Sequence, residues 1–247
     1  MMELLNNIWN VLITPSELNT KLFILPFNFI EMYLFMTLFL TIFNISSNRK
    51  KRIYFVVITS LVIILTNFTI PNPFNVFINY ILFFILILLI FKTTILKALI
   101  SVVSSVAIFA LIGGLILNPY ITILNITTTQ LSNTPIYKIV NLLIMYFIVF
   151  LIIIMLKNLN FKILLSEDID KKTKKIIFLN LIFGIITLIV QAFITFYYID
   201  KLPIIITFLS FISLLAYFSI SIYSLTRVMK LSITTKKLES VEEYNKT

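Results

Sequence analysis

The sequence predicts an all-α integral membrane protein, a polytopic bundle of about seven transmembrane helices that continues into a cytoplasmic, coiled-coil-like helix. Of its 247 residues, 60% are apolar and 12% are charged, and the mean hydropathy is +1.07. A soluble domain carries about a quarter charged residues, so most of this surface must face lipid. The apolar runs are much longer than the roughly 10 residues of a barrel strand and lack its alternation, which favours helices.

Seven apolar segments reach the roughly 17 to 25 residues that a helix needs to cross a bilayer. We place them at 23–45, 53–70, 75–91, 95–117, 138–156, 176–199 and 203–227, so that the transmembrane domain covers 23–227. Pro71 and Pro73 separate the second segment from the third. A residue that precedes a proline disfavours the helical conformation, so the second helix is expected to end there.

Residues 1–22 precede the first span and are expected to form an extracytoplasmic amphipathic segment. Leu4, Ile8 and Leu12 recur at helical spacing beside Trp9, the only tryptophan. Tryptophan favours the headgroup region of a bilayer. Residues 3–14 are therefore predicted to form a short helix that lies at the outer interface.

The lysines and arginines divide unequally between the two sides of the predicted bundle. Alternate connections and the tail contain 17 of them, in 46–52, 92–97, 157–175 and 227–247, whereas the opposite side has Lys21, Lys138 and Lys201. The positive-inside rule then places the protein in the plasma membrane with its amino terminus outside and its carboxyl tail in the cytoplasm. The longest outer connection, 118–137, starts at Asn118-Pro119-Tyr120 and has no charged residue.

The last span is predicted to continue as one helix into a signalling segment over 228–247. No glycine or proline interrupts the chain between Ile204 and Thr247, and Leu231 and Leu238 are seven residues apart. This spacing is typical of the start of a coiled coil. Such a helix could pass movement from the membrane to a cytoplasmic domain, with Arg227 as an anchor at the headgroups; a solvated helical end is the alternative interpretation.

The composition excludes most catalytic chemistry. The chain contains no histidine and no cysteine, which excludes a Ser-His-Asp triad, a cysteine nucleophile and the common zinc sites. It also lacks a glycine-rich phosphate loop. The net charge of +10 lies in short loops between spans, where it indicates topology and anionic-lipid contact rather than nucleic-acid binding. We expect no catalytic residue, no metal site and no cofactor in this chain.

Glu31 is the exception among the acidic residues, because it lies inside the first predicted span. An ionisable group there costs on the order of 3 kcal/mol on insertion scales and is a functional hypothesis by default. Its position in the outer half of the span would let a ligand reach it. The alternative is a structural role, in which Glu31 bonds to a neighbouring helix.

Two further sets of residues inside the spans are expected to serve packing. Four polar residues are expected to bond across helices, namely Asn79, Asn141, Asn180 and Gln191. Small residues on one side of the fourth and seventh spans would let helix backbones approach closely, and these are Ser101, Ser105, Ala110, Gly114, Ser210, Ser213, Ala216, Ser221 and Ser224.

Several junction segments resemble one family. They are 214–218, 224–227, Phe196-Tyr197-Tyr198-Ile199-Asp200-Lys201-Leu202-Pro203 and Leu238-Glu239-Ser240-Val241-Glu242-Glu243-Tyr244-Asn245-Lys246-Thr247. With the opening residues Met2 to Asn7, they look like the membrane sensor region of AgrC-like quorum-sensing histidine kinases. The resemblance spans essentially the whole chain, but the junctions, and chiefly the ending, are its specific part.

The resemblance implies binding of a secreted, often cyclic, peptide at the outer face and a homodimer joined through the tail. In such a receptor the last helix leads to a phosphorylated histidine and a GHKL-type ATP-binding domain, so a cytoplasmic response regulator would be reached only through that missing kinase core. This chain stops before either part and is expected to be the input half, as a truncated piece or a shortened gene product. The expected ligand contacts are Glu31, Tyr120, Tyr197, Tyr198 and Asp200, and the expected signal-coupling residues are Arg227, Leu231 and Leu238.

A second hypothesis from a different class is a small multi-span transporter or channel subunit. Transporters usually have broken helices and several polar groups that converge near the membrane midplane, and Glu31 alone gives that hypothesis little support. A protease that matures the peptide signal would need the histidine and cysteine that this chain lacks.

Overall fold

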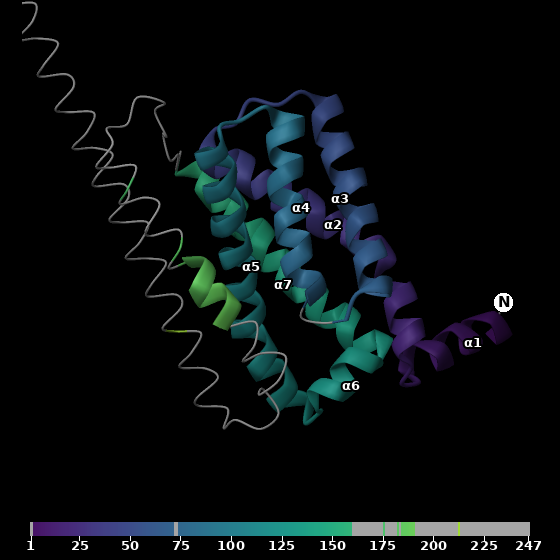
Figure 1. The fold of residues 1–247 in the computed structure, drawn as a ribbon. Helices are drawn as coiled ribbons and strands as arrows, with labels where there is room; N and C mark the ends of the chain where they lie inside the picture. Colours follow the sequence, from purple (N-terminus) through teal and green to yellow (C-terminus); the bar gives the residue numbers. More distant parts are fainter. Residues whose placement is uncertain are drawn as a thin grey trace, which may run out of the picture.

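The computed structural model describes residues 2–71, 74–159, 175, 182, 184–190 and 212. The described part is helical and contains no strand. Its labelled helices are α1 (Met2–Ile13), α2 (Glu17–Phe43), α3 (Arg49–Thr69), α4 (Phe74–Phe91), α5 (Ile95–Leu124), α6 (Thr128–Asn133) and α7 (Pro135–Asn158), and residues 184–190 are also helical (Figure 1). Among these residues, α2, α3, α4, α5 and α7 are long and apolar enough to cross a membrane.

These five helices match the first five predicted spans. Each observed helix contains most of its predicted segment and extends beyond it by up to seven residues, because a helix can continue past the hydrocarbon into the interface. The sixth and seventh predicted spans, 176–199 and 203–227, and the tail 228–247 lie largely or wholly outside the described residues. The count of seven spans and the coiled coil therefore stay predictions.

Polar capping residues mark the beginnings and ends of several helices. The side chains of Ser16, Asn48 and Thr94 each accept a hydrogen bond from the backbone N–H three residues further on, which satisfies a donor that the first helical turn leaves free. Asn44 and Asn125 end α2 and α5 in the left-handed conformation, with φ of 48° and 50°. Asparagine tolerates this conformation, so the chain reverses direction in a few residues.

The region 118–137 is not the long connection expected from the sequence. Helix α5 continues through Pro119 to Leu124, and α6 begins at Thr128, preceded by its N-cap residue Thr127, whose side chain and that of Gln130 form a reciprocal capping box. A proline removes only one N–H from the hydrogen-bond ladder, and helices in apolar surroundings tolerate that loss. The uncharged region is therefore mostly helical, with turns at 125–127 and at Thr134.

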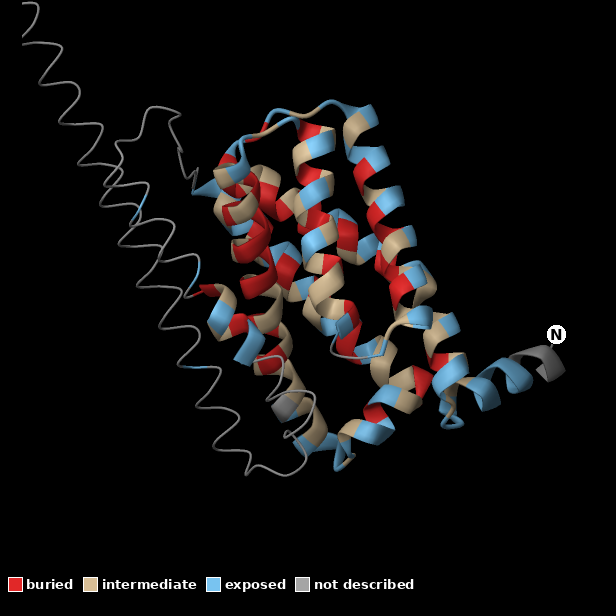
Figure 2. Ribbon diagram, viewed as in Figure 1, coloured by how far each residue is buried: buried red, intermediate tan, exposed pale blue. Residues whose placement is uncertain are grey.

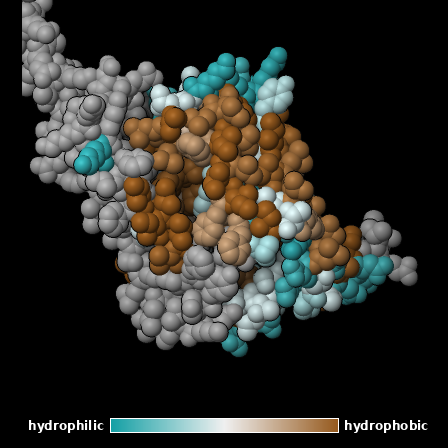
Figure 3. Space-filling view, in the orientation of Figure 1, coloured by the Kyte–Doolittle hydropathy of each residue, from teal (hydrophilic) through white to brown (hydrophobic). Residues whose placement is uncertain are grey.

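The bundle has two polar ends and an apolar belt. The connections 44–48 and 92–94 lie at one end with the first turn of α3, and we call this the basic end; α1 and α6 lie at the other, the α6 end (Figure 1). Figure 3 shows hydrophobic atoms over the middle of the bundle and hydrophilic atoms toward both ends. Buried residues lie on the inward helix faces in Figure 2, and large apolar side chains such as Phe147, 62% exposed, face outward. This arrangement is the one expected of a protein whose surface is solvated by lipid.

An aromatic cluster fills the half of the bundle toward the basic end. Phe39 is fully buried on α2, and its ring meets those of Phe55 on α3 and Phe91 on α4 edge to face, each at 5.4 Å between centroids. Phe35, one turn earlier on α2, meets Phe83 of α4 at 5.3 Å. Such ring pairs contribute about 0.5–1.5 kcal/mol each beyond the area they bury. We call these five residues the aromatic cluster.

Some of the small and polar residues that were expected to serve helix packing do so in the structure. Ser101 and Ser105 are fully buried on α5, as expected for a close helix contact. Asn79 accepts a hydrogen bond of 2.9 Å from the Thr66 hydroxyl across α3 and α4, which confirms its prediction. The Asn141 side-chain oxygen, by contrast, is buried without a partner in the part of the chain that the structure describes, so the expectation of a satisfied amide is not met for that atom there. Asn180 and Gln191 lie outside the described residues, as do Ser210, Ser213, Ala216, Ser221 and Ser224.

Helix α6 is held against the beginning of α2 by one carbonyl group. The Asn133 carbonyl oxygen accepts a hydrogen bond of 2.7 Å from the Ser16 N–H and another of 2.7 Å from the Thr20 hydroxyl. Thr20 is 2% exposed. The link therefore joins residues that are more than a hundred positions apart at the α6 end.

Replacing Thr20 with valine is expected to lower the free energy of unfolding by about 1 kcal/mol, because it keeps the shape of the side chain and removes a buried donor. Hydrogen exchange in detergent should also become faster over 128–133. The matched control is Thr69→Val, since the Thr69 hydroxyl is exposed and bonds only to Leu65 of its own helix. Equal effects of the two substitutions would contradict the role given to Thr20.

Candidate functional site

A cavity of about 620 Å³ lies at the α6 end, between α2, α3, α4, α6 and α7. Its α2 wall follows a spacing of three and four residues, which places one helix face toward the cavity; these residues are Glu17, Thr20, Lys21, Ile24, Leu25, Asn28, Glu31 and Met32. Glu17 and Ser132 at the rim are exposed, so the cavity reaches the surface. From Glu17 to Glu31 it follows α2 for roughly 21 Å at 1.5 Å per residue.

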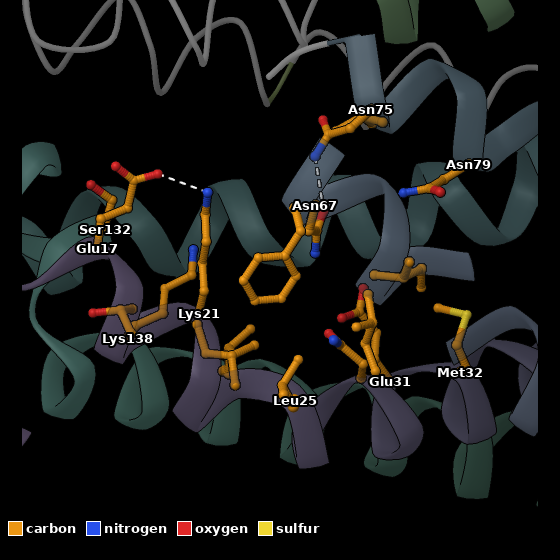
Figure 4. A pocket seen from close by; sticks show the side chains of 18 of the residues that line it. Glu17, Lys21, Leu25, Glu31, Met32, Asn67, Asn75, Asn79, Ser132 and Lys138 are labelled. Atoms are coloured by element: carbon orange, nitrogen blue, oxygen red, sulfur yellow. Dashed lines mark hydrogen bonds and ion pairs between the residues drawn. The ribbon is translucent and has the colours of Figure 1, made fainter. Parts of the chain in front are cut away.

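Three asparagines form the polar wall opposite α2 (Figure 4). Asn67 lies on α3, and Asn75 and Asn79 follow one another by one turn on α4. The Asn75 amide nitrogen donates a hydrogen bond of 2.8 Å to the Asn67 side-chain oxygen. The Asn75 side-chain oxygen has no partner among the described residues, although the residue is only 4% exposed. A buried acceptor without a donor costs about 1–3 kcal/mol, so a ligand that donates a hydrogen bond there would be favoured.

Glu31 lies at the deep end of the cavity, far from Glu17 and Ser132 (Figure 4). Its Oε2 accepts a hydrogen bond of 3.1 Å from the hydroxyl of Tyr146, which is 4% exposed on α7. No ion pair to Glu31 is found among the described residues. One phenol thus holds one carboxylate oxygen in place, and the carboxylate keeps capacity for another donor.

Two lysines lie on the rim side of the cavity (Figure 4). Lys21 pairs with Glu17 at 2.8 Å and lies over the ring of Phe68. Lys138 of α7 is half-buried and has no ion pair within the described part of the chain. The cavity is therefore polarised, with a cation that has no ion pair among the described residues toward the rim and an anion at the deep end.

The cavity has the size and mixed lining of a small-ligand site. Pockets of about 300–1,000 Å³ with apolar walls and a few placed polar groups are typical of small-ligand sites. Leu25, Ile63 and Leu142 supply apolar wall here. The deep end favours a cationic or hydrogen-bond-donating group, and the rim favours a carbonyl or carboxylate. A molecule that carries both kinds of group, such as a peptide, fits this polarity.

Two of the expected ligand-contact residues, Glu31 and Tyr120, lie within the described part of the chain. Glu31 lines the cavity, while Tyr120 does not: its hydroxyl donates a hydrogen bond of 3.0 Å to the Tyr137 carbonyl and joins α5 to α7. The remaining expected residues lie outside the described ranges; these are Tyr197, Tyr198 and Asp200 for ligand contact and Arg227, Leu231 and Leu238 for coupling.

Three cavity residues, Asn28, Asn67 and Asn75, were not expected from the sequence. Neither was Tyr146, which bonds to Glu31 without lining the cavity. One signal was available on α2, where Glu17, Lys21, Asn28 and Glu31 share a helix face by their spacing. No such signal joins Glu31 to Tyr146, because they are 115 residues apart.

Comparison of the chain with protein-family models, with curated proteins and with solved structures finds no match. Function therefore has to be inferred from the chemistry of the cavity and from the charge pattern of the chain.

Proposed function

We propose that this chain is the membrane-embedded input module of a sensor histidine kinase of the AgrC-like kind. It binds a secreted cyclic peptide at its outer face and passes the signal through its last span to a cytoplasmic kinase core. The observation that carries the proposal is the polarised cavity of about 620 Å³, with Glu31 at its deep end and, in the wall opposite α2, an Asn75 side-chain oxygen that has no hydrogen-bond partner among the described residues.

The charge pattern supports an outward opening of this cavity. Four of the seventeen basic residues counted on the predicted cytoplasmic side lie in 49–52 at the basic end. With the basic end in the cytoplasm under the positive-inside rule, the α6 end faces outward. A secreted peptide then reaches Lys138 before it reaches Glu31.

The residues at the deep end of the cavity suggest how ligand binding there could change the packing of the rest of the bundle. Phe83 lines the cavity and also meets the ring of Phe35, which lies one turn after Glu31 on α2. A ligand that binds one arrangement of α2 and α4 better than another shifts the population toward it. Repacking of the aromatic cluster would carry that shift toward the basic end, and from there to Arg227, Leu231 and Leu238 in a dimeric tail.

The alternative, a transporter or channel subunit, has less support from the cavity. A conducting path needs polar groups that continue across the membrane. Below Glu31 the described bundle is filled by the aromatic cluster, in which Phe39 and Phe55 are 0% exposed and Phe91 is 5% exposed. The packed aromatic cluster would block a ligand from crossing the bundle, which fits a receptor that binds its ligand without transporting it.

Residues 1–247, fused in helical register to the kinase core of a characterised peptide receptor, are expected to confer a peptide-dependent response on a reporter strain. Culture supernatant from cells that carry this gene should change reporter output by about tenfold, a coupling free energy in the range typical of allosteric proteins. The kinase core without residues 1–247 is the control and should not respond. A chimera that reaches normal membrane levels, carries an activatable kinase and responds to no supernatant would refute the receptor proposal.

A further inference from the structure

A second concave surface lies between α2 and α3 toward the basic end, where it begins on α2 just beyond the deep end of the cavity. This groove encloses about 390 Å³. Arg49 and Arg52 line one end, and the remaining wall is Tyr33 together with apolar side chains, among them Met36, Ile53 and Val57. It therefore combines a cationic end with an apolar trough.

The two arginines are available to an anion. Arg52 donates a hydrogen bond of 2.8 Å from Nε to the Ser47 hydroxyl and a second, of 3.5 Å, to the Ser47 carbonyl. These bonds orient the guanidinium and leave N–H groups free. Arg49 is exposed and has no ion pair among the described residues, and the first turn of α3 contains no acidic residue.

The apolar trough lies where lipid chains would contact the protein. Ile53 is 51% exposed and Val57 is 40% exposed on α3, and Tyr33 is 56% exposed on α2, while Met36 at 1% exposure is buried beside them. The exposed residues belong to candidate membrane spans. An acyl chain along this trough would begin at the level of the two guanidinium groups.

We propose that this groove is a binding site for an anionic phospholipid. The phosphate pairs with the guanidinium groups of Arg49 and Arg52, which match phosphate oxygens in a forked geometry, and one acyl chain lies along Ile53 and Val57. Basic pockets between membrane helices are suited to anionic headgroups. A zwitterionic choline headgroup brings a quaternary ammonium beside the two arginines and is disfavoured. The site is independent of the peptide-sensing proposal, because it shares no residue with the cavity.

The chain supplies a matched control for this site. Lys50 and Lys51 lie in the same helical turn as the two arginines, and neither lines the groove. The double substitutions R49Q/R52Q and K50Q/K51Q therefore remove the same charge from the same turn. Only the first pair removes it from the groove.

The test measures retention of phosphatidylglycerol against phosphatidylcholine by native mass spectrometry of the full chain in detergent. The wild-type chain is expected to favour phosphatidylglycerol by about tenfold or more, because two cations near the surface act on one extra anionic charge. R49Q/R52Q should reduce the preference to about twofold or less, whereas K50Q/K51Q should keep most of it. A third variant, Val57→Phe, fills the trough without changing charge and should also weaken phosphatidylglycerol binding.

The outcomes distinguish a specific lipid-binding site from unspecific electrostatic attraction between the lipid and the basic turn. Equal losses in R49Q/R52Q and K50Q/K51Q would overturn the proposal in favour of unspecific electrostatics, and so would an unchanged preference in both. Competition by millimolar inorganic phosphate, together with full binding in Val57→Phe, would mean that the arginines bind phosphate alone and the trough holds no acyl chain. Thermal unfolding of each variant shows whether the bundle is intact, and all substituted residues except Val57 lie in the first turn of α3.

Discussion

Glu31→Gln is expected to raise the ligand concentration for a half-maximal response of the chimeric receptor by at least about tenfold, which corresponds to about 1.4 kcal/mol of binding free energy. Glutamine has nearly the shape of glutamate, and its side-chain oxygen can still accept the hydrogen bond from Tyr146. The substitution therefore removes the charge at the deep end of the cavity and leaves the contact between α2 and α7.

The membrane level of the Glu31→Gln protein should be normal or higher, because a neutral amide inserts into a bilayer at lower cost than a carboxylate. Dose–response curves with fractionated supernatant and immunoblots of membranes measure the two effects separately. The control is Glu17→Gln at the rim, where the ion pair with Lys21 is largely exposed and exposed pairs contribute little; its curve should shift by about twofold at most. Normal response and normal membrane levels in Glu31→Gln would end the assignment of Glu31 to the ligand.

Phe39→Ala is expected to have the largest effect on stability, with a loss of about 3 kcal/mol in the free energy of unfolding. Phe39 contacts the rings of Phe35, Phe55 and Phe91, so its removal opens a space that three helices border. The value lies at the low end of the range for buried phenylalanine, because unfolded helices stay in lipid or detergent and keep their apolar solvation.

The measurement is unfolding of the purified chain in mixed micelles with increasing sodium dodecyl sulfate, followed by circular dichroism. Phe147→Ala is the matched control, since Phe147 is 62% exposed on the outward face of α7, and it should change the free energy by no more than about 0.5 kcal/mol. If the two substitutions cost the same, packing at the aromatic cluster is not what stabilises the bundle.

Hydropathy was sufficient to predict the five long helices α2, α3, α4, α5 and α7, and the ends of those helices needed chemistry that hydropathy does not measure. A run of apolar residues marks a span wherever it occurs, so α3 and α4 were found within a few residues of their limits. The end of α5 was predicted seven residues too early, at 117, whereas the helix continues to Leu124 and ends at Asn125 in the left-handed conformation. The capping pair Thr127 and Gln130 was present in the sequence and could have predicted α6.

The cavity could be predicted only in part, because it is made by contacts between helices. Glu31 stood out by itself, since an acid in an apolar segment has a high cost. Its partner Tyr146 did not, because tyrosine is common in membrane helices and nothing in the local sequence ties residue 146 to residue 31. The unpartnered oxygen of Asn75 is a property of the packed structure, because a side chain becomes buried and unsatisfied only when its neighbours are in place.

The two halves of α2 have a consequence for how such a protein can change over evolutionary time. Residues 17–32 include one face that lines the cavity, and Phe35 and Phe39 anchor the aromatic cluster in the next two turns. Recognition and stability are therefore assigned to separate stretches of one helix. Substitutions on the cavity face can alter ligand preference while the packed half keeps the fold, so related chains could diverge into distinct signalling specificities without first losing stability.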